Sequence, residues 1–472
     1  MSSRLRDQYS IKMAKILIPI SNSFFVRNFL RAGFLEFFPI DTKFVFLVPR
    51  EKIAYYRKEF PKENLDFVDL PVVRFKWAEK FSRECEASMI PTRTVLMMHQ
   101  FHFCRKGTKQ RLIFRLPIFI GRMILWCAGH TRLAREAFRF MYRLFQESLY
   151  QRCIRELMPD LLFCPTMVYG KEWILLKEAK RLSVPTIGMT SSWDNLYAKT
   201  FLRVKPDRLL LQTELMKATA LLFCDFPRAR ISVTGVPQYD RYFRRPPALD
   251  RDGFIRRLGG DPKKKLILYA FSGKVTTDLD MTAVRFLADS IAACRLFHST
   301  QILVRPYPKR DFTEAKIDRL KHDYPGLLVN RSAMSVGTSK DAWEFDETAL
   351  SFLGESLEYA DVVVTACSTF IVEAAVFGKP IVSIGFDFEK NVNYWNSARR
   401  FFDWNHLSDI KPLGGVKVAA SREDLLSALN QYLEDPLLLS SGRRAIVNQQ
   451  CGFSDGRSVF RVAEEINRQL KI

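Results

Sequence analysis

Residues 358–387 read as a complete strand–turn–helix–strand unit, EYADVVVTACSTFIVEAAVFGKPIVSIGFD. The valine run at 362–364 is typical of a buried parallel strand. Small residues follow it, and then an apolar helical pattern stops at Gly378, with Pro380 beyond. A second β-branched run at 381–384 predicts the next strand. Because parallel neighbouring strands need a crossover connection, this unit predicts an α/β fold with a parallel sheet.

The turn between this strand and its helix is a candidate phosphate site. Ser368 and Thr369 place two hydroxyls where the helix is expected to begin. A helix amino terminus adds unpaired N–H groups and the positive end of the helix dipole, and both favour an anion. Glu373 lies one turn further on, within reach of ribose hydroxyls. The alternative is an ordinary βαβ unit in which Ser and Thr only cap the helix.

The whole chain alternates strand-like and helix-like runs, which predicts a doubly wound α/β architecture. At 472 residues it is too long for one core. We expect a Rossmann-like domain over residues 1–238, a linker rich in Arg, Lys, Pro, Gly and Asp over 239–264, and a second Rossmann-like domain over 265–472. A cleft is expected between the two domains. One helix is expected over residues 24–37, directly after the first strand.

The cysteines and the amino terminus bear on the compartment. The nine cysteines include no C-x-x-C pair, which indicates reduced, mostly buried thiols and no metal site. The apolar run at 16–20 is too short for the hydrophobic region of a signal peptide and fits a first core strand. Both features predict a cytoplasmic protein.

The formal net charge of +22 indicates an anionic partner or surface. The sequence has no zinc-finger spacing, no RNP-like signature and no basic low-complexity tail, so nucleic acid is not the expected partner. Residues 101–150 hold ten Lys or Arg against two Glu, with Leu, Ile, Phe and Trp interleaved. That pattern is typical of a basic amphipathic helix at an anionic membrane surface.

Within this insertion, seven residues are expected at the membrane surface: Arg115, Arg122, Trp126, Arg132, Arg135, Arg139 and Arg143. Arg115 and Arg122 interrupt the longest apolar run, so a membrane-spanning helix is not expected. The alternative is a pair of helices packed inside the domain, with arginine stems that reach outward.

Four segments carry a resemblance to a known superfamily: SSWDNLYAK (191–199), ISVTGVPQYD (231–240), ADVVVTACSTFIVEAAVFGKPIV (360–382) and SDGRSVFRVAEEI (454–466). With them the chain resembles glycosyltransferases of the GT-B fold, in the branch of CDP-glycerol glycerophosphotransferases and surface-polysaccharide glycosyltransferases. Non-hydrolysing UDP-GlcNAc 2-epimerases are more distantly similar. The resemblance implies a nucleotide-activated donor in the C-terminal domain and an acceptor in the N-terminal domain. It also implies a C-terminal helix that packs back across both domains, and no metal or other cofactor.

The resemblance assigns Ser368 and Thr369 to the donor's phosphates and Glu373 to its ribose or sugar. A second candidate phosphate loop follows the strand expected at 265–271, where ligands collect in open sheets. Its residues are Ser272, Gly273 and Lys274. The alternative for this loop is a plain polar turn.

The stretch RPYPK at 305–309 ends another predicted strand. Arg305 would neutralise a leaving diphosphate, and Lys309 would add positive charge beside it. Tyr307 stands where the glycerophosphotransferase-like enzymes often have His, and a phenol with a pKa of about 10 does not exchange protons at neutral pH as imidazole does. This departure favours sugar transfer over CDP-glycerol chemistry. The alternative is a strand-end loop in which two prolines enforce a turn.

The loop at 191–195 is the best candidate for acceptor-side chemistry, since it follows a predicted strand of the N-terminal half and would face the cleft. Asp194 is its only carboxylate and would accept the proton of an acceptor hydroxyl. The alternative is that Asp194 only braces the turn. The other acceptor-side candidates are Ser192, Trp193, Asn195, Lys199, His99 and His102.

Together these features favour a cytoplasmic transferase, peripheral on the inner face of the cell membrane. It would move a sugar from a nucleotide sugar to a lipid-linked or surface-polysaccharide acceptor. The first alternative is transfer of glycerol or ribitol phosphate from a CDP-activated donor. The second is a membrane-peripheral scaffold that has kept a degenerate GT-B fold and lost turnover.

Overall fold

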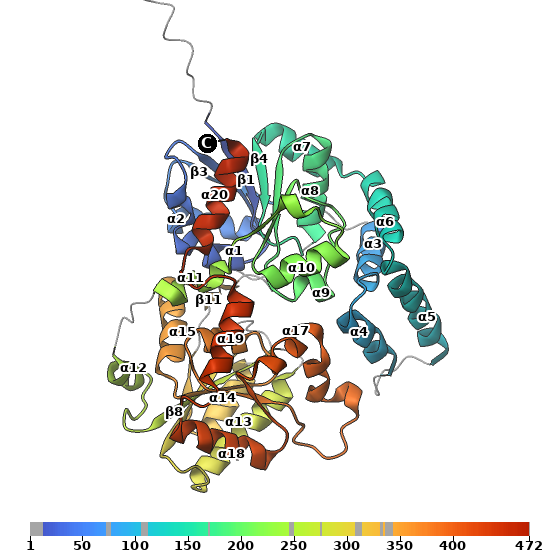
Figure 1. Cartoon of the computed structure of the whole chain (residues 1–472). Helices are drawn as coiled ribbons and strands as arrows, with labels where there is room; N and C mark the ends of the chain where they lie inside the picture. Colours follow the sequence, from blue (N-terminus) through green and yellow to red (C-terminus); the bar gives the residue numbers. More distant parts are fainter. Residues whose placement is uncertain are drawn as a thin grey trace, which may run out of the picture.

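The computed structural model describes residues 13–71, 77–104, 112–168, 170–244, 250–273, 276–306, 314–330, 334–335 and 343–471. Two parallel sheets dominate the fold (Figure 1). The N-terminal sheet has seven strands in the spatial order β3-β2-β1-β4-β5-β6-β7, and the C-terminal sheet has six in the order β10-β9-β8-β13-β14-β15. Helices join the parallel strands, so two doubly wound α/β domains are confirmed.

The strands of the N-terminal sheet are β1 (Lys15–Pro19), β2 (Lys43–Val48), β3 (Leu65–Asp69), β4 (Leu161–Cys164), β5 (Thr186–Met189), β6 (Arg208–Leu211) and β7 (Ile231–Val233). Those of the C-terminal sheet are β8 (Lys265–Ala270), β9 (Thr300–Arg305), β10 (Leu328–Val329), β13 (Val362–Thr365), β14 (Ile381–Ile384) and β15 (Lys417–Ala419). A separate antiparallel pair is formed by β11 (Met334–Ser335) and β12 (Trp343–Glu344).

The helices up to the end of the N-terminal sheet are α1 (Phe24–Asn28), α2 (Ile53–Glu59), α3 (Trp77–Ser88), α4 (Arg93–Cys104), α5 (Leu112–Gly129), α6 (Arg132–Leu144), α7 (Ser148–Leu157), α8 (Gly170–Arg181), α9 (Asn195–Ala198) and α10 (Glu214–Phe223). Those that follow are α11 (Pro237–Arg244), α12 (Arg251–Arg257), α13 (Thr277–Ala292), α14 (Glu314–Asp323), α15 (Glu347–Tyr359), α16 (Phe370–Val376), α17 (Asn405–Ser408), α18 (Arg422–Glu434), α19 (Ser440–Cys451) and α20 (Ser458–Leu470). The predicted linker region thus contains α11 and α12.

The strand–turn–helix–strand unit predicted within residues 358–387 forms as β13, α16 and β14. Gly378 lies just after the helix in the left-handed region, with φ +67°, where a side chain would be strained. In both sheets the strand order reverses beside the first strand, between β1 and β4 and between β8 and β13. Ligands of open α/β sheets bind at such switch points, outside the carboxyl ends of the strands.

The single helix predicted over residues 24–37 is wrong. Helix α1 stops at Asn28, and two 3-10 turns, Leu30–Ala32 and Phe34–Phe37, continue the segment. Gly33 separates these turns with φ +80°, a left-handed conformation that breaks the helical path. The sequence interpretation gave this glycine too little weight, because the apolar residues around it keep a helical spacing.

The C-terminal helix α20 packs against the N-terminal sheet (Figure 1), which confirms the predicted return across the domains. Val459, Val462 and Ile466 are fully buried in the core beneath β1 and β2. The carboxylate of Asp240, on α11, accepts hydrogen bonds from the backbone N–H groups of Ser458 and Val459 at 2.9 and 2.8 Å. Helix α20 therefore clamps α11, the connection between the sheets, to the N-terminal domain.

Helices α3 to α6 form an arm at the side of the N-terminal domain (Figure 1). Among the described residues, no helix is long and apolar enough to cross a membrane. The apolar side chains exposed along α5 and α6 include Phe114, Ile118, Ile124, Leu133 and Phe140.

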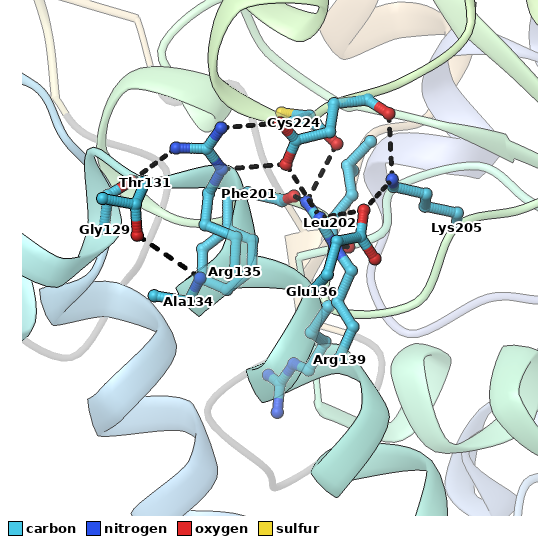
Figure 2. Close-up of polar contacts among 12 residues, drawn as sticks. Gly129, Thr131, Ala134, Arg135, Glu136, Arg139, Phe201, Leu202, Lys205 and Cys224 are labelled. Carbon is cyan, nitrogen blue, oxygen red and sulfur yellow. Dashed lines mark hydrogen bonds and ion pairs between the residues drawn. The ribbon is translucent and has the colours of Figure 1, made fainter.

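Two of the arginines predicted to lie at a membrane surface are instead buried (Figure 2). Arg135 donates from Nε and from one terminal nitrogen to the two carboxylate oxygens of Asp225, at 2.8 and 2.6 Å. Arg139 donates to Asp225 at 2.9 Å and to the backbone carbonyls of Phe201, Leu202 and Cys224 at 2.8–3.0 Å. These guanidiniums are not available to lipid, because their N–H groups hold α6 to the domain.

Of the other five residues predicted to lie at a membrane surface, three are half-buried and two are exposed. Trp126 is half-buried and donates its indole N–H to the carbonyl of Thr92 at 3.1 Å, so it anchors α5 rather than a lipid interface. Arg115 and Arg122 are also half-buried. The exposed residues of the predicted set are Arg132 and Arg143.

All nine cysteines are free thiols, and five of them are buried: Cys85, Cys153, Cys164, Cys224 and Cys451.

Candidate functional site

A cavity of about 480 Å³ lies between the two domains, at the carboxyl ends of strands from both sheets. The N-terminal wall consists of residues after β1, such as Asn22 and Arg27, and of the loop after β5. The C-terminal wall consists of the residues that follow β8 and β13, together with Arg305 at the end of β9. Both switch points thus open into one space, as expected for a ligand cleft.

Nine of the residues predicted from the sequence line this cavity: Ser192, Trp193, Asp194, Lys199, Ser272, Arg305, Ser368, Thr369 and Glu373. Gly273, Asn195, His99 and His102 do not line it. Three residues of the sequence analysis lie outside the described residues: Lys274, Lys309, and Tyr307, which stands where the glycerophosphotransferase-like enzymes often have His. The fold therefore unites most of the predicted donor and acceptor residues, although they are up to 181 positions apart (Ser192 to Glu373).

Arg305 contributes a guanidinium to the C-terminal wall. Its side chain is buried, and the guanidinium lies over the ring of Phe370, 5.0 Å from the ring centroid. Its Nε atom has no hydrogen-bond partner among the described residues. A buried guanidinium with an unused donor is suited to an anionic ligand, because that ligand supplies the missing acceptor.

Arg27 approaches the same cavity from the N-terminal domain, on α1. Burial lowers the pKa of Arg27, and the positive charge of Arg305 lowers it further, whereas Glu373 opposes both effects. The sequence interpretation did not single out Arg27. Its position shortly after the first strand was the available signal, since loops at this point of a doubly wound sheet contact ligands.

The loop after β8 is held firmly to the loop after β13. The Ser272 hydroxyl accepts a hydrogen bond from the backbone N–H of Ala366 at 3.1 Å and lies 3.2 Å from the hydroxyl of Thr365. The Ser272 N–H donates to the carboxylate of Asp280 at 3.2 Å. Burial raises the pKa of Asp280 to about 7. Gly273 adopts φ +147°, a backbone conformation that glycine tolerates and that this loop requires.

In the turn before α16, the groups available to an anionic ligand are the side-chain hydroxyls of Ser368 and Thr369. The Ser368 hydroxyl accepts from the N–H of Phe370 at 3.2 Å, whereas the exposed side chain of Thr369 makes no capping hydrogen bond. Helix α16 has seven residues, so we assign anion contacts here to side chains.

Glu373 has a structural role that the sequence did not reveal. It is buried, and its two carboxylate oxygens accept hydrogen bonds from Tyr242 at 2.7 Å and Gln238 at 3.0 Å. Both donors belong to α11. The carboxylate therefore ties the connection between the domains to the C-terminal wall, in addition to its place in the cavity.

On the N-terminal wall, Asp194 forms an ion pair with Lys199 at 2.9 Å and accepts from the Asn195 amide at 3.1 Å. Burial by itself would raise the pKa of Asp194, but the Lys199 ammonium and a hydrogen bond from Ser192 hold it below its usual value. Asp194 is therefore ionised at neutral pH, as a proton acceptor must be.

Comparison with known proteins identified similar solved structures. No protein-family model matches this chain. No curated protein matches it either. A UDP-GlcNAc 2-epimerase from Methanocaldococcus jannaschii is 12% identical, with 97% of this chain and 99% of that chain covered and a TM-score of 0.53. A UDP-GlcNAc 2-epimerase from Neisseria meningitidis bound to UDP-GlcNAc is 11% identical, with the same coverage and a TM-score of 0.52. A glycosyltransferase from Rickettsia africae is 11% identical, with 98% and 99% covered and a TM-score of 0.50.

The chain has the GT-B fold. At these identities the likeness extends to the fold, and the predicted architecture of two Rossmann-like domains is confirmed by it. In this GT-B cleft the C-terminal wall carries the Arg305 guanidinium, several hydroxyl groups and the Glu373 carboxylate. The N-terminal wall carries Arg27, Lys199 and the ionised carboxylate of Asp194. Among the described residues, no cluster of His, Cys, Asp or Glu has the arrangement of a metal site.

Three predicted acceptor-side residues do not line the GT-B cleft. Asn195 is fully buried, and its side-chain oxygen accepts from the N–H groups of Ser191 and Ser192, both at 3.1 Å, so it shapes the loop instead of facing an acceptor. His99 is buried on α4, where burial lowers its pKa to about 4. His102 lies on the same helix.

His406, like Arg27, is a site residue that the sequence analysis missed. It lines the cleft from α17, with its ring centroid 5.3 Å from that of Trp193, and its Nδ1 atom has no partner among the described residues. Burial lowers its pKa, whereas the nearby Asp194 opposes this effect. The sequence held no signal for this placement, because α17 and the 191–195 loop are more than two hundred residues apart and meet only in the folded protein.

Proposed function

We propose that this chain is a glycosyltransferase that moves a sugar from a nucleotide-sugar donor to a hydroxyl of a lipid-linked or polysaccharide acceptor. The observation that carries this proposal is one GT-B cleft with the Arg305 guanidinium on its C-terminal wall, which we call the donor wall, and the ionised carboxylate of Asp194 on its N-terminal wall, which we call the acceptor wall. Arg27 adds a second guanidinium from the acceptor wall. Related folds support the donor class, since the Neisseria meningitidis epimerase structure contains UDP-GlcNAc.

In the proposed reaction, Arg305 and Arg27 bind the donor's diphosphate, and the Ser368 and Thr369 hydroxyls donate to its oxygens. As the acceptor oxygen bonds to the anomeric carbon, the bond from that carbon to the diphosphate breaks and the leaving group takes the electron pair. Guanidinium groups stabilise the negative charge that develops there. Asp194 accepts the proton of the acceptor hydroxyl.

A screen of UDP, GDP, CDP and CMP by thermal shift tests the donor site. A bound nucleotide should stabilise the folded protein by about 2.7 kcal/mol at about a hundredfold excess over its Kd. The sugar conjugates of the nucleotide that binds are then incubated with and without candidate acceptors. Sugar release only in the presence of an acceptor supports transfer. A 2-epimer formed without acceptor, a transferred polyol phosphate, or no stabilisation by any nucleotide would contradict the proposal.

We also propose that the arm of α3 to α6 holds the enzyme at the inner face of the cell membrane. Apolar side chains exposed on α5 and α6, among them Ile124 and Leu133, would enter the lipid interface, and Arg132 and Arg143 would meet anionic head groups. The double variant Ile124→Ser/Leu133→Ser should no longer float with anionic liposomes. Leu222→Ser on α10, an apolar position outside the arm that is about as exposed as Ile124, is the control. Equal flotation of both variants would remove this part of the proposal.

A further inference from the structure

A second cavity, of about 540 Å³, lies between α6, α8 and the residues that lead into β6. Eight of its eleven lining residues are Lys or Arg, and none is acidic. It shares no residue with the interdomain cleft. It also lies near the amino-terminal end of β6, whereas the cleft lies at the carboxyl ends of the strands.

Some of these cations already have partners in the wall of the cavity. Arg203 is buried and pairs with Glu79 and Glu86, both at 2.8 Å. Lys205 pairs with Glu136 at 2.6 Å, beside the Arg139 network (Figure 2). These pairs hold the cavity in shape, and their carboxylates do not line it.

Other cations of the cavity have no close counter-ion. Arg143 and Arg230 are exposed and form no ion pair among the described residues. The side chain of Lys177 is only 3% exposed, and its ammonium lies 3.8 Å from the nearest paired carboxylate oxygen, on Glu178. It sits over the ring of Tyr142, 4.4 Å from the centroid. A buried ammonium without a close hydrogen-bonding acceptor is unfavourable unless a ligand supplies one.

We propose that this cavity binds a phosphate group. A phosphate oxygen placed among Lys177, Arg143 and Arg230 would receive charge-assisted hydrogen bonds from them. Within the described part of the chain, Arg143 uses one donor, Nε, on the Arg139 carbonyl at 3.4 Å, and its terminal nitrogens form no ion pair. Leu144 also lines the cavity and is 64% exposed, and Phe140 and Met141, one turn back on α6, are exposed as well. An apolar chain attached to the phosphate would lie along these residues, which favours a lipid phosphate over a free one.

The test uses two probes: pyrophosphate by calorimetry, and flotation of phosphatidylcholine vesicles with and without phosphatidic acid. The double variant Arg143→Gln/Arg230→Gln removes two exposed charges from the cavity. The control Arg152→Gln/Arg228→Gln removes two exposed charges from neighbouring elements outside it. Binding of either probe should weaken about tenfold or more in the first variant and stay near wild type in the second.

The two probes separate the sources of the phosphate. Binding of pyrophosphate would assign the site to soluble phosphates as well, whereas binding of phosphatidic acid vesicles alone would assign it to lipid. If only the phosphatidic acid vesicles bind, Leu144→Ser should also weaken their flotation relative to wild type. An equal loss in both double variants would mean that surface charge alone attracts the probes, and this result would overturn the proposal. Failure of the wild type to bind either probe would overturn it too.

Discussion

The two walls of the cleft hold their charges in different ways. On the C-terminal wall, Arg305 is buried against Phe370 with an unused Nε donor. On the N-terminal wall, Asp194 is already paired with Lys199. A guanidinium with an unused donor gains a partner when an anion binds, whereas a paired carboxylate stays ionised with or without substrate. Donor-wall substitutions should therefore change affinity and rate together, and acceptor-wall substitutions should change rate alone.

The largest effect is expected for Asp194→Asn, which keeps the shape of the side chain and removes the proton acceptor. Loss of a general base typically lowers the rate by about 10²–10⁴. Donor affinity, measured by calorimetry with the nucleotide found in the screen, should stay near wild type because Asp194 belongs to the opposite wall. Near-normal turnover of the Asn variant would show that Asp194 is not the general base.

The pH profile separates Asp194 from His406. Since the pKa of Asp194 lies below its usual value, kcat/KM should hold from neutral into weakly acid pH and fall only as the pH passes through that lowered value. If the neutral imidazole of His406 accepts the proton, the fall in kcat/KM at acid pH should instead follow the imidazole pKa, which burial lowers from 6.5, and His406→Asn should remove that step from the profile.

A somewhat smaller effect is expected for Arg305→Ala. Removal of one preorganised donor to a developing charge typically costs about 10²–10³ in rate. Here nucleotide affinity should fall as well, and Arg305→Lys should restore part of both because it keeps the charge without the planar fork. Unchanged nucleotide affinity in a folded Arg305→Ala variant would contradict the expectation that donor-wall substitutions change affinity and rate together.

Asp280, beneath the donor-wall loop, should make stability depend on pH. Its pKa is raised from 3.8 to about 7 by burial, so its contribution is present at low pH and is lost as the pH rises through about 7. At about 1.4 kcal/mol per pKa unit, wild type should lose up to about 4 kcal/mol relative to Asp280→Asn between pH 4 and 8. Parallel denaturation curves for the two proteins at both pH values would show that Asp280 does not titrate in this way.

The smallest effect is expected for Tyr242→Phe, which removes the hydroxyl that donates to Glu373. A hydrogen bond to a charged group contributes about 1.5–3 kcal/mol, so urea unfolding should detect a loss of that size. Tyr239→Phe is the control, because Tyr239 is equally buried on α11 and makes no hydrogen bond to Glu373. An equal loss in both variants would assign the effect to packing.

Local patterns predicted the cleft residues well where chemistry follows directly from a strand. Ser368, Ser272 and Asp194 all stand in loops just after strands, and parallel topology brings the carboxyl ends of those strands to one side. The failures have a different cause. The alternation of basic and apolar residues in 101–150 is the same whether an arginine faces lipid or a buried carboxylate, so it could not separate Arg132 from Arg139.

The sequence by itself determined the parts of this protein that depend on short-range patterns: the parallel strands, the glycine that ends α16, the division into two α/β domains and the loops that carry hydroxyl, carboxylate and guanidinium groups. The tertiary structure alone decided which of these groups meet. Arg27, His406 and the Glu373–Tyr242 pair come together across hundreds of residues, and Asp225 turns two surface-like arginines into core residues. Contacts of this range depend on how whole domains pack, and no window of the sequence contains both partners.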